Sequence, residues 1–291
     1  MTTILEKLIT GWCWFSVLIL LSGTGFVLST LYYKGMPHLD GGLIFGSTSP
    51  MDALLLKRQV FDGLFPAIIG TLLLVLLSIS WALPVGLAAG IYLSEYAQGR
   101  VKLIFDILFD LLASIPSILI GLFGFSLVII LHRILDRLTP SLLISSLSLA
   151  LLVLPYIIRT TQVSLESLPL ETRLTGYALG ATRLQNIFFI LLPRSLNEIS
   201  SGIILAIGRC AEDTAVIMLT GAVATAGIPR SLLSQYEALP FYIYTISAQY
   251  TDRQELMTGY SASIILLTLC LLLFGLAALL KKRLTQGQPS H

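Results

Sequence analysis

The sequence predicts an all-α integral membrane protein with about six transmembrane helices, and three observations support this fold class. Hydrophobic residues make up 55% of the chain and charged residues only 12%, and the mean hydropathy is +0.87. A soluble domain carries roughly 25% charged residues, because its surface must be solvated. The apolar residues form continuous runs and do not alternate with polar ones, which favours helices over the strands of a membrane barrel. Most of the surface is therefore expected to face lipid.

Six apolar runs reach or approach the ~20 residues that a helix needs to cross the hydrocarbon layer. The predicted spans are Gly11–Leu31, Pro66–Leu93, Leu103–Leu131, Ser141–Ile158, Ile199–Ala224 and Tyr260–Leu280. The fourth is the shortest and contains four serines. The first is longer than the apolar core of a signal peptide, and no small-residue cleavage site follows it, so we expect it to remain as a membrane helix.

The basic residues predict the orientation of the spans. If the amino terminus is cytoplasmic, ten Lys and Arg residues of the connecting segments lie inside and seven lie outside. Cytoplasmic loops carry an excess of Lys and Arg, and Lys281, Lys282 and Arg283 follow the last span directly. We therefore expect both termini and segment 159–194 to be cytoplasmic, and segments 32–65 and 225–259 to lie outside.

The motifs of common enzymes and nucleotide-binding proteins are missing from the sequence. No lysine follows a glycine, so there is no G-x-x-x-x-G-K-[ST] loop to hold a nucleotide. The three histidines are scattered, and the three cysteines lie in apolar runs without a C-x-x-C pair. The net charge of +2 comes with no basic patch, which argues against nucleic acid as a partner. We expect no catalytic residue, no metal site and no cofactor bound by this chain.

Segment 159–194 is longer than a connection between adjacent membrane helices requires. Within it, five residues recur at helical spacing and would share one apolar face: Leu174, Tyr177, Ala178, Ala181 and Leu184. Gly180 lies inside this pattern and indicates a bend or a close backbone approach. Such a helix would either dock into a groove of another protein or lie on the lipid headgroups.

Three charged residues, Arg209, Glu212 and Asp213, are predicted near the middle of the fifth span. Each charge at the bilayer centre costs about 2.5–3.5 kcal/mol on insertion scales, so the cluster needs a compensating environment. The acids follow Arg209 by three and four residues, and both can reach its guanidinium on one helix face. The cluster is either an ion pair that only stabilises the bundle or the polar lining of a translocation path.

The segment around Gly180 resembles a loop of the membrane subunits of type I ABC importers. In these proteins the loop has the form E-A-A, three residues, Gly, nine residues, Ile, one residue, Leu-Pro, and its short helix couples the subunit to an ATPase. This chain has Gly180, then nine residues, Ile190, and Leu192-Pro193. It departs from the pattern at the E-A-A positions, which hold Leu174, Thr175 and Gly176.

Four further stretches resemble signatures of phosphate-specific permeases of the PstA type, over roughly residues 63 to 225. They are GLFPAIIGTLLL, LPVGLAAGIYLSEYA, SIPSILIGLFGF and LPYIIRTTQVSLESLP. The resemblance implies that Arg159, Arg209 and Glu212 match family positions, and it favours the path interpretation of the charged cluster. Helix packing gives two of the matching glycines a role, because Gly86 and Gly90 are spaced to let helices approach closely.

The resemblance implies a membrane-spanning permease that imports inorganic phosphate across the bacterial cytoplasmic membrane by alternating access. The expected units are residues 1–62 (first helix and extracytoplasmic loop), 63–283 (permease domain) and 284–291 (cytoplasmic tail). The expected partners are a second permease, an ATPase dimer that uses ATP-Mg, and an extracytoplasmic phosphate-binding protein. The alternatives are an importer of another oxyanion or small solute, an ATP-independent channel or carrier, and a scaffold or sensor without transport activity.

Overall fold

The computed structural model describes residues 2–54, 60, 63–134 and 139–285, and in these residues the secondary structure is helical apart from one isolated bridge. The helices are α1 (Thr2–Gly35), α2 (Gly41–Phe45), α3 (Pro50–Leu54), α4 (Phe65–Glu95), α5 (Gly99–Ser114), α6 (Ser117–His132), α7 (Leu142–Glu166), α8 (Leu170–Ala178), α9 (Arg183–Asn186), α10 (Leu192–Glu212), α11 (Ala215–Thr220), α12 (Leu239–Gln249) and α13 (Arg253–Thr285). A 3₁₀ turn (Met36–His38) follows α1, and a π-helical turn (Ile187–Leu191) joins α9 to α10.

Five helical stretches are long and apolar enough to cross a membrane, and a bent pair, α5 with α6, makes a sixth candidate. The prediction of about six spans in an all-α membrane protein is therefore confirmed. The shortest predicted span, Ser141–Ile158, is in fact part of the 25-residue helix α7. This helix is the centre of the bundle, and Leu149, Val153 and Ile157 are buried in it.

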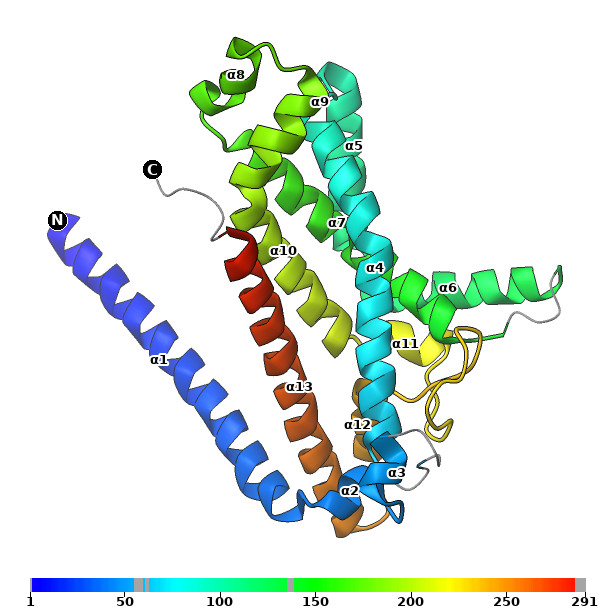
Figure 1. Cartoon of the computed structure of the whole chain (residues 1–291). Helices are drawn as coiled ribbons and strands as arrows, with labels where there is room; N and C mark the ends of the chain where they lie inside the picture. Colours follow the sequence, from blue (N-terminus) through cyan, green and yellow to red (C-terminus); the bar gives the residue numbers. More distant parts are fainter. Residues whose placement is uncertain (1, 55–59, 61–62, 135–138, 286–291) are drawn as a thin grey trace.

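The third predicted span, Leu103–Leu131, is not one straight helix. It consists of α5 and α6, which meet at an angle of 95°. The bend falls at Ile115 and Pro116, and Ile115 has an extended backbone (φ −67°, ψ 127°). A proline disfavours the helical conformation of the residue before it and cannot donate its own backbone hydrogen bond. As a result α5 runs along the bundle, whereas α6 turns away to the side (Figure 1).

The fifth predicted span, Ile199–Ala224, is also broken. Helix α10 ends at Glu212, and Asp213 has an extended backbone with ψ 119°. The Asp213 Oδ1 then accepts a hydrogen bond of 2.9 Å from the amide of Val216, which caps the short helix α11. The charged cluster therefore lies at the end of a helix and not in the interior of a continuous one.

Close packing of α4 on α7 depends on small residues, as the spacing of Gly86 and Gly90 predicts. A Cβ atom added at Gly86 would lie 2.6 Å from the Cγ2 atom of Ile157. A Cβ atom at Gly90 would lie 2.6 Å from the Cβ atom of Thr161. These distances are too short for a side chain, so both glycines are needed for the two helices to approach.

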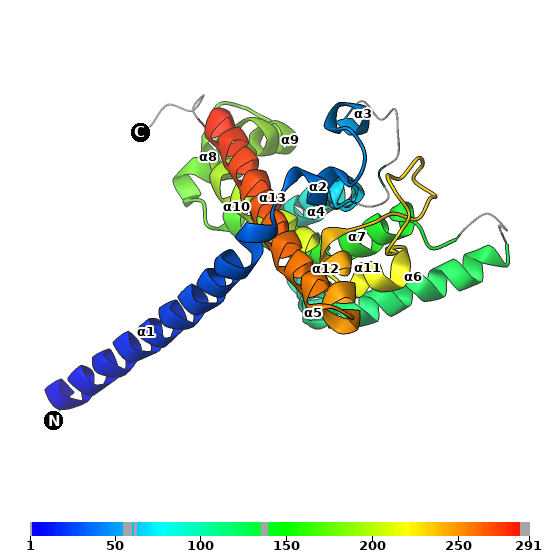
Figure 2. The same cartoon turned by 90° about the horizontal axis from the view of Figure 1, so that it is seen from below.

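The start of α1 and the end of α13 lie at the same end of the molecule as α8 and α9, while α2 and α12 lie at the opposite end (Figure 1). Helix α1 leans away from the bundle (Figure 2). Its exposed apolar residues include Trp12 and Leu20, which are 72% and 67% exposed. It is attached near its last residue, where the Ser261 hydroxyl donates a 2.8 Å hydrogen bond to the Gly35 carbonyl. The rest of α1 is left for lipid or another chain to cover.

The segment between α11 and α12 folds back into the bundle. Tyr236 is fully buried, and the amide of Leu142 donates to the carbonyl of Ser234 at 3.0 Å. The buried carboxylate of Glu237 accepts hydrogen bonds from the amides of Ala226 and Gly227, at 2.9 and 2.7 Å. This segment therefore forms part of the core at the end of the molecule opposite α8 and α9.

Candidate functional site

Arg209 lies in the last turn of α10, at the break between α10 and α11. Ile207, two residues earlier, lines a cavity together with Ile79, Leu83 and Pro84 of α4. These three residues are near the middle of the 31-residue helix α4. The sequence prediction of mid-membrane depth therefore agrees with the fold, although the expected continuous helix does not.

The three predicted charges do not form one cluster around the guanidinium. The Arg209 Nη1 donates to the Glu212 Oε1 at 3.0 Å, and the two side chains are 40% and 62% exposed. Asp213 is only 5% exposed, and its carboxylate caps α11. Because α10 ends at Glu212, Asp213 no longer follows the helical spacing that would direct it to Arg209. Arg209 and Glu212 thus form the ion pair, and the buried Asp213 carboxylate interacts with the guanidinium electrostatically without a hydrogen bond to it.

One donor of Arg209 is unsatisfied. Its Nε atom is buried and has no hydrogen-bond partner among the described residues. An ion would not reach this atom, which has almost no accessible surface, but would meet the rest of the side chain, which is 40% exposed. The exposed partner Glu212 lies beside it. Together they offer donors to an anion and a carboxylate that can accept a proton from it.

Arg159, the second predicted path residue, is held by acids of a neighbouring helix. On α5, Asp106 accepts from the Arg159 Nη1 at 2.7 Å, and Asp110 accepts from the Nε at 3.0 Å. The Nη2 lies 2.6 Å from the Asp110 carboxylate and also donates to the Asp106 carbonyl. All three guanidinium nitrogens are therefore engaged within this chain.

The acids that hold Arg159 belong to a longer ladder between α5 and α7. Gln162 donates to both Asp106 and Glu166, each at 3.1 Å, and Lys102 donates to Glu166 at 2.7 Å. Lys102, Asp106, Asp110, Gln162 and Glu166 were not among the predicted site residues. A signal was present, because Lys102, Asp106 and Asp110 are spaced by four residues at the start of an apolar run.

The two arginines stand at different depths. Thr160, next to Arg159, packs at Gly202 of α10, where an added Cβ atom would be 2.5 Å away. Gly202 precedes Arg209 by two helical turns, which corresponds to roughly 10 Å along the axis. Arg159 therefore lies nearer to α8 and α9 than Arg209 does, and the two arginines do not form one site.

Segment 170–186 forms a hairpin of two short helices, not the continuous helix that was predicted. Helix α8 ends at Ala178, and Gly180 has a φ of +77°. The amide of Ala181 bonds to the Gly176 carbonyl at 2.9 Å, and that of Gly180 to the Tyr177 carbonyl at 3.0 Å. This Schellman pattern ends a helix and favours glycine at the left-handed position. The glycine of the motif, Gly180, is thus explained by its left-handed backbone conformation and not by a close approach of another element.

Arg173 fixes the hairpin to the bundle, and Asn186 and Gly176 hold its two helices together. Arg173 donates to the buried carboxylate of Glu95 and to the Leu165 carbonyl. Asn186 donates to the Arg173 carbonyl at 2.9 Å. A Cβ atom at Gly176 would lie 2.2 Å from the Asn186 Oδ1, so α8 can pack on α9 only if this position is very small. The departure from E-A-A at Gly176 is therefore accommodated by the local packing.

The predicted coupling residues divide into an exposed and a packed set. Ala178 and Ala181 flank the turn, and Ile190 packs against Gly176. Leu192 and Pro193 begin α10, where a proline needs no donor. The large exposed members are Leu174 (50%), Tyr177 (45%) and Leu184 (59%), and with Leu179 (82%), which was not predicted, they form the apolar rim of the hairpin. The face expected on one helix is instead assembled from α8, the turn and α9.

No three His, Cys, Asp or Glu side chains in residues 2–54, 60, 63–134 and 139–285 are placed to share a metal ion. The arrangement in this part of the chain offers anion contacts at Arg209 and an apolar contact surface on the hairpin.

Comparison with known proteins shows similarity over nearly the whole chain. The family described as binding-protein-dependent transport system inner membrane component matches residues 82–286. The phosphate transport system permease protein PstA of Haemophilus influenzae is 33% identical over 273 residues, which cover 92% of each chain. The PstA protein of Yersinia pestis is 34% identical over 256 residues, covering 87% of this chain and 81% of the relative.

A solved structure shows the same fold. A bacterial ABC transporter involved in the import of the acidic polysaccharide alginate has a chain that superposes with a TM-score of 0.64 at 17% identity. The alignment covers 94% of this chain and 96% of that one. The predicted type I ABC importer permease fold is thereby confirmed. The family match also includes residues 225–259, where no resemblance was recognised from motifs.

Proposed function

We propose that this chain, which belongs to the PstA family of phosphate permeases within the inner membrane components of binding-protein-dependent transport systems, imports inorganic phosphate as one subunit of an ATP-driven transporter. The observation that supports this most directly is the Arg209–Glu212 pair at the helix break, whose side chains are 40% and 62% exposed within this chain. The chain itself carries out no covalent chemistry.

The chemistry of the pair suits phosphate. A guanidinium offers several donors in a fixed plane, which matches the oxygens of a phosphate ion. At neutral pH phosphate still carries at least one proton, so it can donate to Glu212 while it accepts from Arg209. Sulfate has no proton to donate and would be repelled by the carboxylate. The pair would therefore favour phosphate over sulfate.

The exposed surfaces support an assembly with further subunits. Helix α5 has no buried residue within this chain, and α1 is exposed along most of its length. A second permease would cover part of these surfaces and complete the path beside Arg209. A phosphate-binding protein would deliver the ion on the side of α2 and α12, and two ATPase subunits would act on the opposite side. Alternating access of the helices would then move the ion inward.

The hairpin of α8 and α9 would be the contact with an ATPase. Leu179 supports this role, because it is 82% exposed at the turn and has no packing task within the chain. Leu179→Asp should leave insertion and folding unchanged and abolish copurification of the ATPase. Thr175→Asp is the matched control, since it adds the same charge to an exposed residue of α8 outside the apolar rim. Equal recovery of the ATPase with both variants would refute the docking role and favour the lipid-surface interpretation.

The transport function is tested by uptake in cells that lack their own phosphate permeases. Expression of this chain with its partner subunits should restore uptake of radioactive phosphate. The uptake should be blocked by vanadate, which inhibits ABC ATPases, and should persist with a proton uncoupler while ATP is maintained. Uptake that stops with the uncoupler but not with vanadate would indicate an ion-coupled carrier. Restored uptake of sulfate in place of phosphate would assign another oxyanion.

A further inference from the structure

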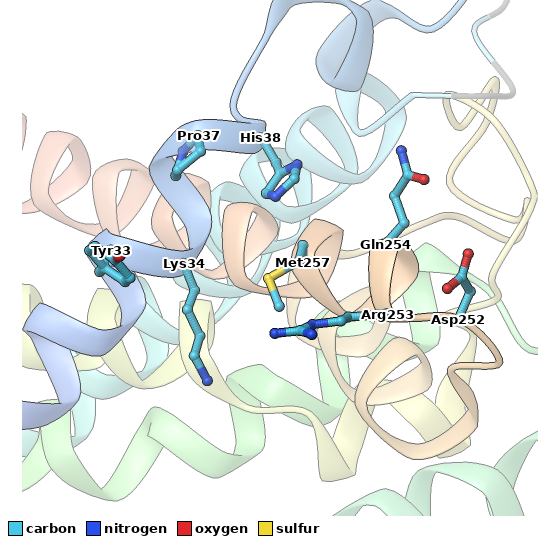
Figure 3. A pocket seen from close by; sticks show the side chains of 8 residues that line it. All are labelled: Tyr33, Lys34, Pro37, His38, Asp252, Arg253, Gln254 and Met257. Carbon is cyan, nitrogen blue, oxygen red and sulfur yellow. The ribbon is translucent and has the colours of Figure 1, made fainter.

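A basic cavity of about 570 Å³ lies at the junction of α1 and α13, at the end of the molecule opposite the hairpin. Its lining includes Tyr33 and Lys34 of α1 and His38 of the following 3₁₀ turn. On the other side it includes Arg253 and Met257 of α13 and the preceding Asp252. Figure 3 shows the Arg253 guanidinium turned toward Lys34 and away from Asp252. Two cations thus approach one space from two different helices.

These cations are not neutralised within the described part of the chain. Lys34 donates weakly to the Tyr260 hydroxyl at 3.5 Å and lies over the Tyr260 ring, 5.0 Å from its centre. No ion pair joins Lys34 or Arg253 to a carboxylate among the described residues. With Asp252 counted, the cavity has a net charge of +1 when His38 is neutral. It therefore attracts an anion.

A second, apolar cavity of about 190 Å³ lies between α12, α13 and the end of α1. Leu31, Ile243, Ile246 and Leu256 line it, together with Tyr260, the residue that contacts Lys34. Leu31 precedes Lys34 on α1, so this cavity lies further into the membrane than the basic one. A basic recess and a deeper apolar one, linked through the contact of Lys34 with Tyr260, match the two parts of a phospholipid.

The level of the junction also matches the membrane surface. Tyr32, Tyr33 and Tyr250 are 62%, 82% and 50% exposed around it. Tyrosines gather at the boundary between headgroups and hydrocarbon, because their rings are apolar and their hydroxyls polar. A headgroup phosphate at this level would lie within reach of the two cations of the basic cavity.

We propose that the junction of α1 and α13 binds an anionic phospholipid, with the headgroup phosphate between Lys34 and Arg253 and an acyl chain in the apolar cavity. A free phosphate ion would use the same two cations but would gain nothing from the apolar cavity. The bound lipid would tie α1 to the bundle at the point where α1 is attached. This inference requires only that α1 and α13 cross the membrane and does not depend on the transported ion.

The test uses the complete transporter purified in mild detergent and incubated with equal amounts of phosphatidylglycerol and phosphatidylcholine. Retained lipid is counted by mass spectrometry. We expect several-fold more phosphatidylglycerol than phosphatidylcholine on the unaltered protein, and equal amounts on Lys34→Gln/Arg253→Gln. The charge-preserving variant Lys34→Arg/Arg253→Lys should keep the preference. Arg230→Gln should also keep it, since it removes one exposed cation outside the cavity.

A separate arm distinguishes lipid from free phosphate. Ser247→Phe fills the apolar cavity without changing its charge, and it should lower retention of phosphatidylglycerol. Equilibrium dialysis with radioactive inorganic phosphate supplies the comparison. If Ser247→Phe retains as much lipid as the unaltered protein, or if Lys34→Gln/Arg253→Gln loses phosphate binding but no lipid, the lipid proposal is wrong. Equal retention of both lipids by the unaltered protein would also overturn it.

Discussion

Two arginines that match the same family pattern have different surroundings. Every nitrogen of the Arg159 guanidinium has a partner on α5 or α7, whereas the Nε of Arg209 has none among the described residues. An arginine with all donors engaged within its own chain has little capacity left for a substrate. This difference supports the proposal that Arg209, and not Arg159, contacts the ion, and it identifies Arg159 as a residue that joins α5 to α7.

This difference predicts a loss of stability when Arg159 is changed. Arg159→Met should lower the free energy of unfolding by about 1–3 kcal/mol, because Asp106 and Asp110 lose a charged partner. The loss should be partly reversed in Arg159→Met/Asp106→Asn. Thermal unfolding in detergent measures the loss. The control is Arg100→Met, which removes an exposed arginine from α5, the helix that carries Asp106 and Asp110. A midpoint of Arg159→Met equal to that of the control would contradict the structural role.

Glu237 predicts a pH dependence of stability. Burial raises the pKa of Glu237 above its ordinary value of 4.5, and the amides of Gly227 and Ala226 oppose this shift. An acid whose pKa is higher in the folded state stabilises the fold most below its unfolded pKa. That contribution is lost as pH rises through the folded pKa.

Glu237→Gln keeps an oxygen for the two amides and removes the titration. Its thermal midpoint should equal that of the unaltered protein at pH 4 and exceed it at pH 8. Equal midpoints at both pH values would show that ionisation of the buried Glu237 carboxylate does not destabilise the fold. A lower midpoint of the variant at pH 8 would show that the charged form is the stabilising one.

At the scale of single elements, the turn between α8 and α9 depends on Gly180. An L residue at φ +77° is strained by about 1–2 kcal/mol, even though an added Cβ atom would meet no neighbour within 4 Å. Gly180→Ala should therefore accelerate hydrogen exchange of the Ala181 amide by about 5- to 30-fold. The matched control is Gly99→Ala, with φ +55° at the start of α5, which should leave the Ala181 amide unchanged. Unaltered exchange in Gly180→Ala would contradict the Schellman geometry.

Apolar composition predicted where the chain crosses the membrane, but not where the helices bend. Hydropathy does not distinguish a straight span from α5 and α6, because the apolar residues continue directly on both sides of Pro116. The break after Glu212 was hidden for the opposite reason, since helical spacing explained Arg209, Glu212 and Asp213 without one. The hairpin was predicted as one helix because Gly180 was interpreted as a bend within it and not as its end.

At the scale of the whole molecule, the start of α1, the end of α13 and the hairpin lie on the same side (Figure 1). The basic residues in the last turns of α13 predict that this side is cytoplasmic. Labelling with an impermeant thiol reagent in a cysteine-free background tests it. Ser47→Cys and Ser231→Cys should react in intact cells, and Thr175→Cys only after permeabilisation. Reaction of Thr175→Cys in intact cells would invert the orientation.

Family membership and the number of spans could be predicted from the sequence because they depend on local motifs and composition. The α5–α7 ladder and the cavities at the junction of α1 and α13 could not be predicted, because they join residues far apart in the chain. Lys34 and Tyr260 are one example, separated by 226 positions. Arg159 and Asp106 are another, separated by 53. Such contacts follow from tertiary packing, which helical periodicity does not encode.

The central claim is that phosphate crosses the membrane past Arg209 at the break between α10 and α11. ATP-driven phosphate uptake into proteoliposomes with the complete transporter tests it in the double variant Arg209→Met/Glu212→Gln, which removes both charges of the pair and leaves Asp213 its hydrogen bond from the Val216 amide. The control is Lys102→Gln/Glu166→Gln, which removes another ion pair of the same chain. We expect both double variants to fold and assemble. The control should transport phosphate, and the Arg209→Met/Glu212→Gln variant should not. Near-normal uptake by a well-folded Arg209 variant would contradict the claim and leave the pair a structural one.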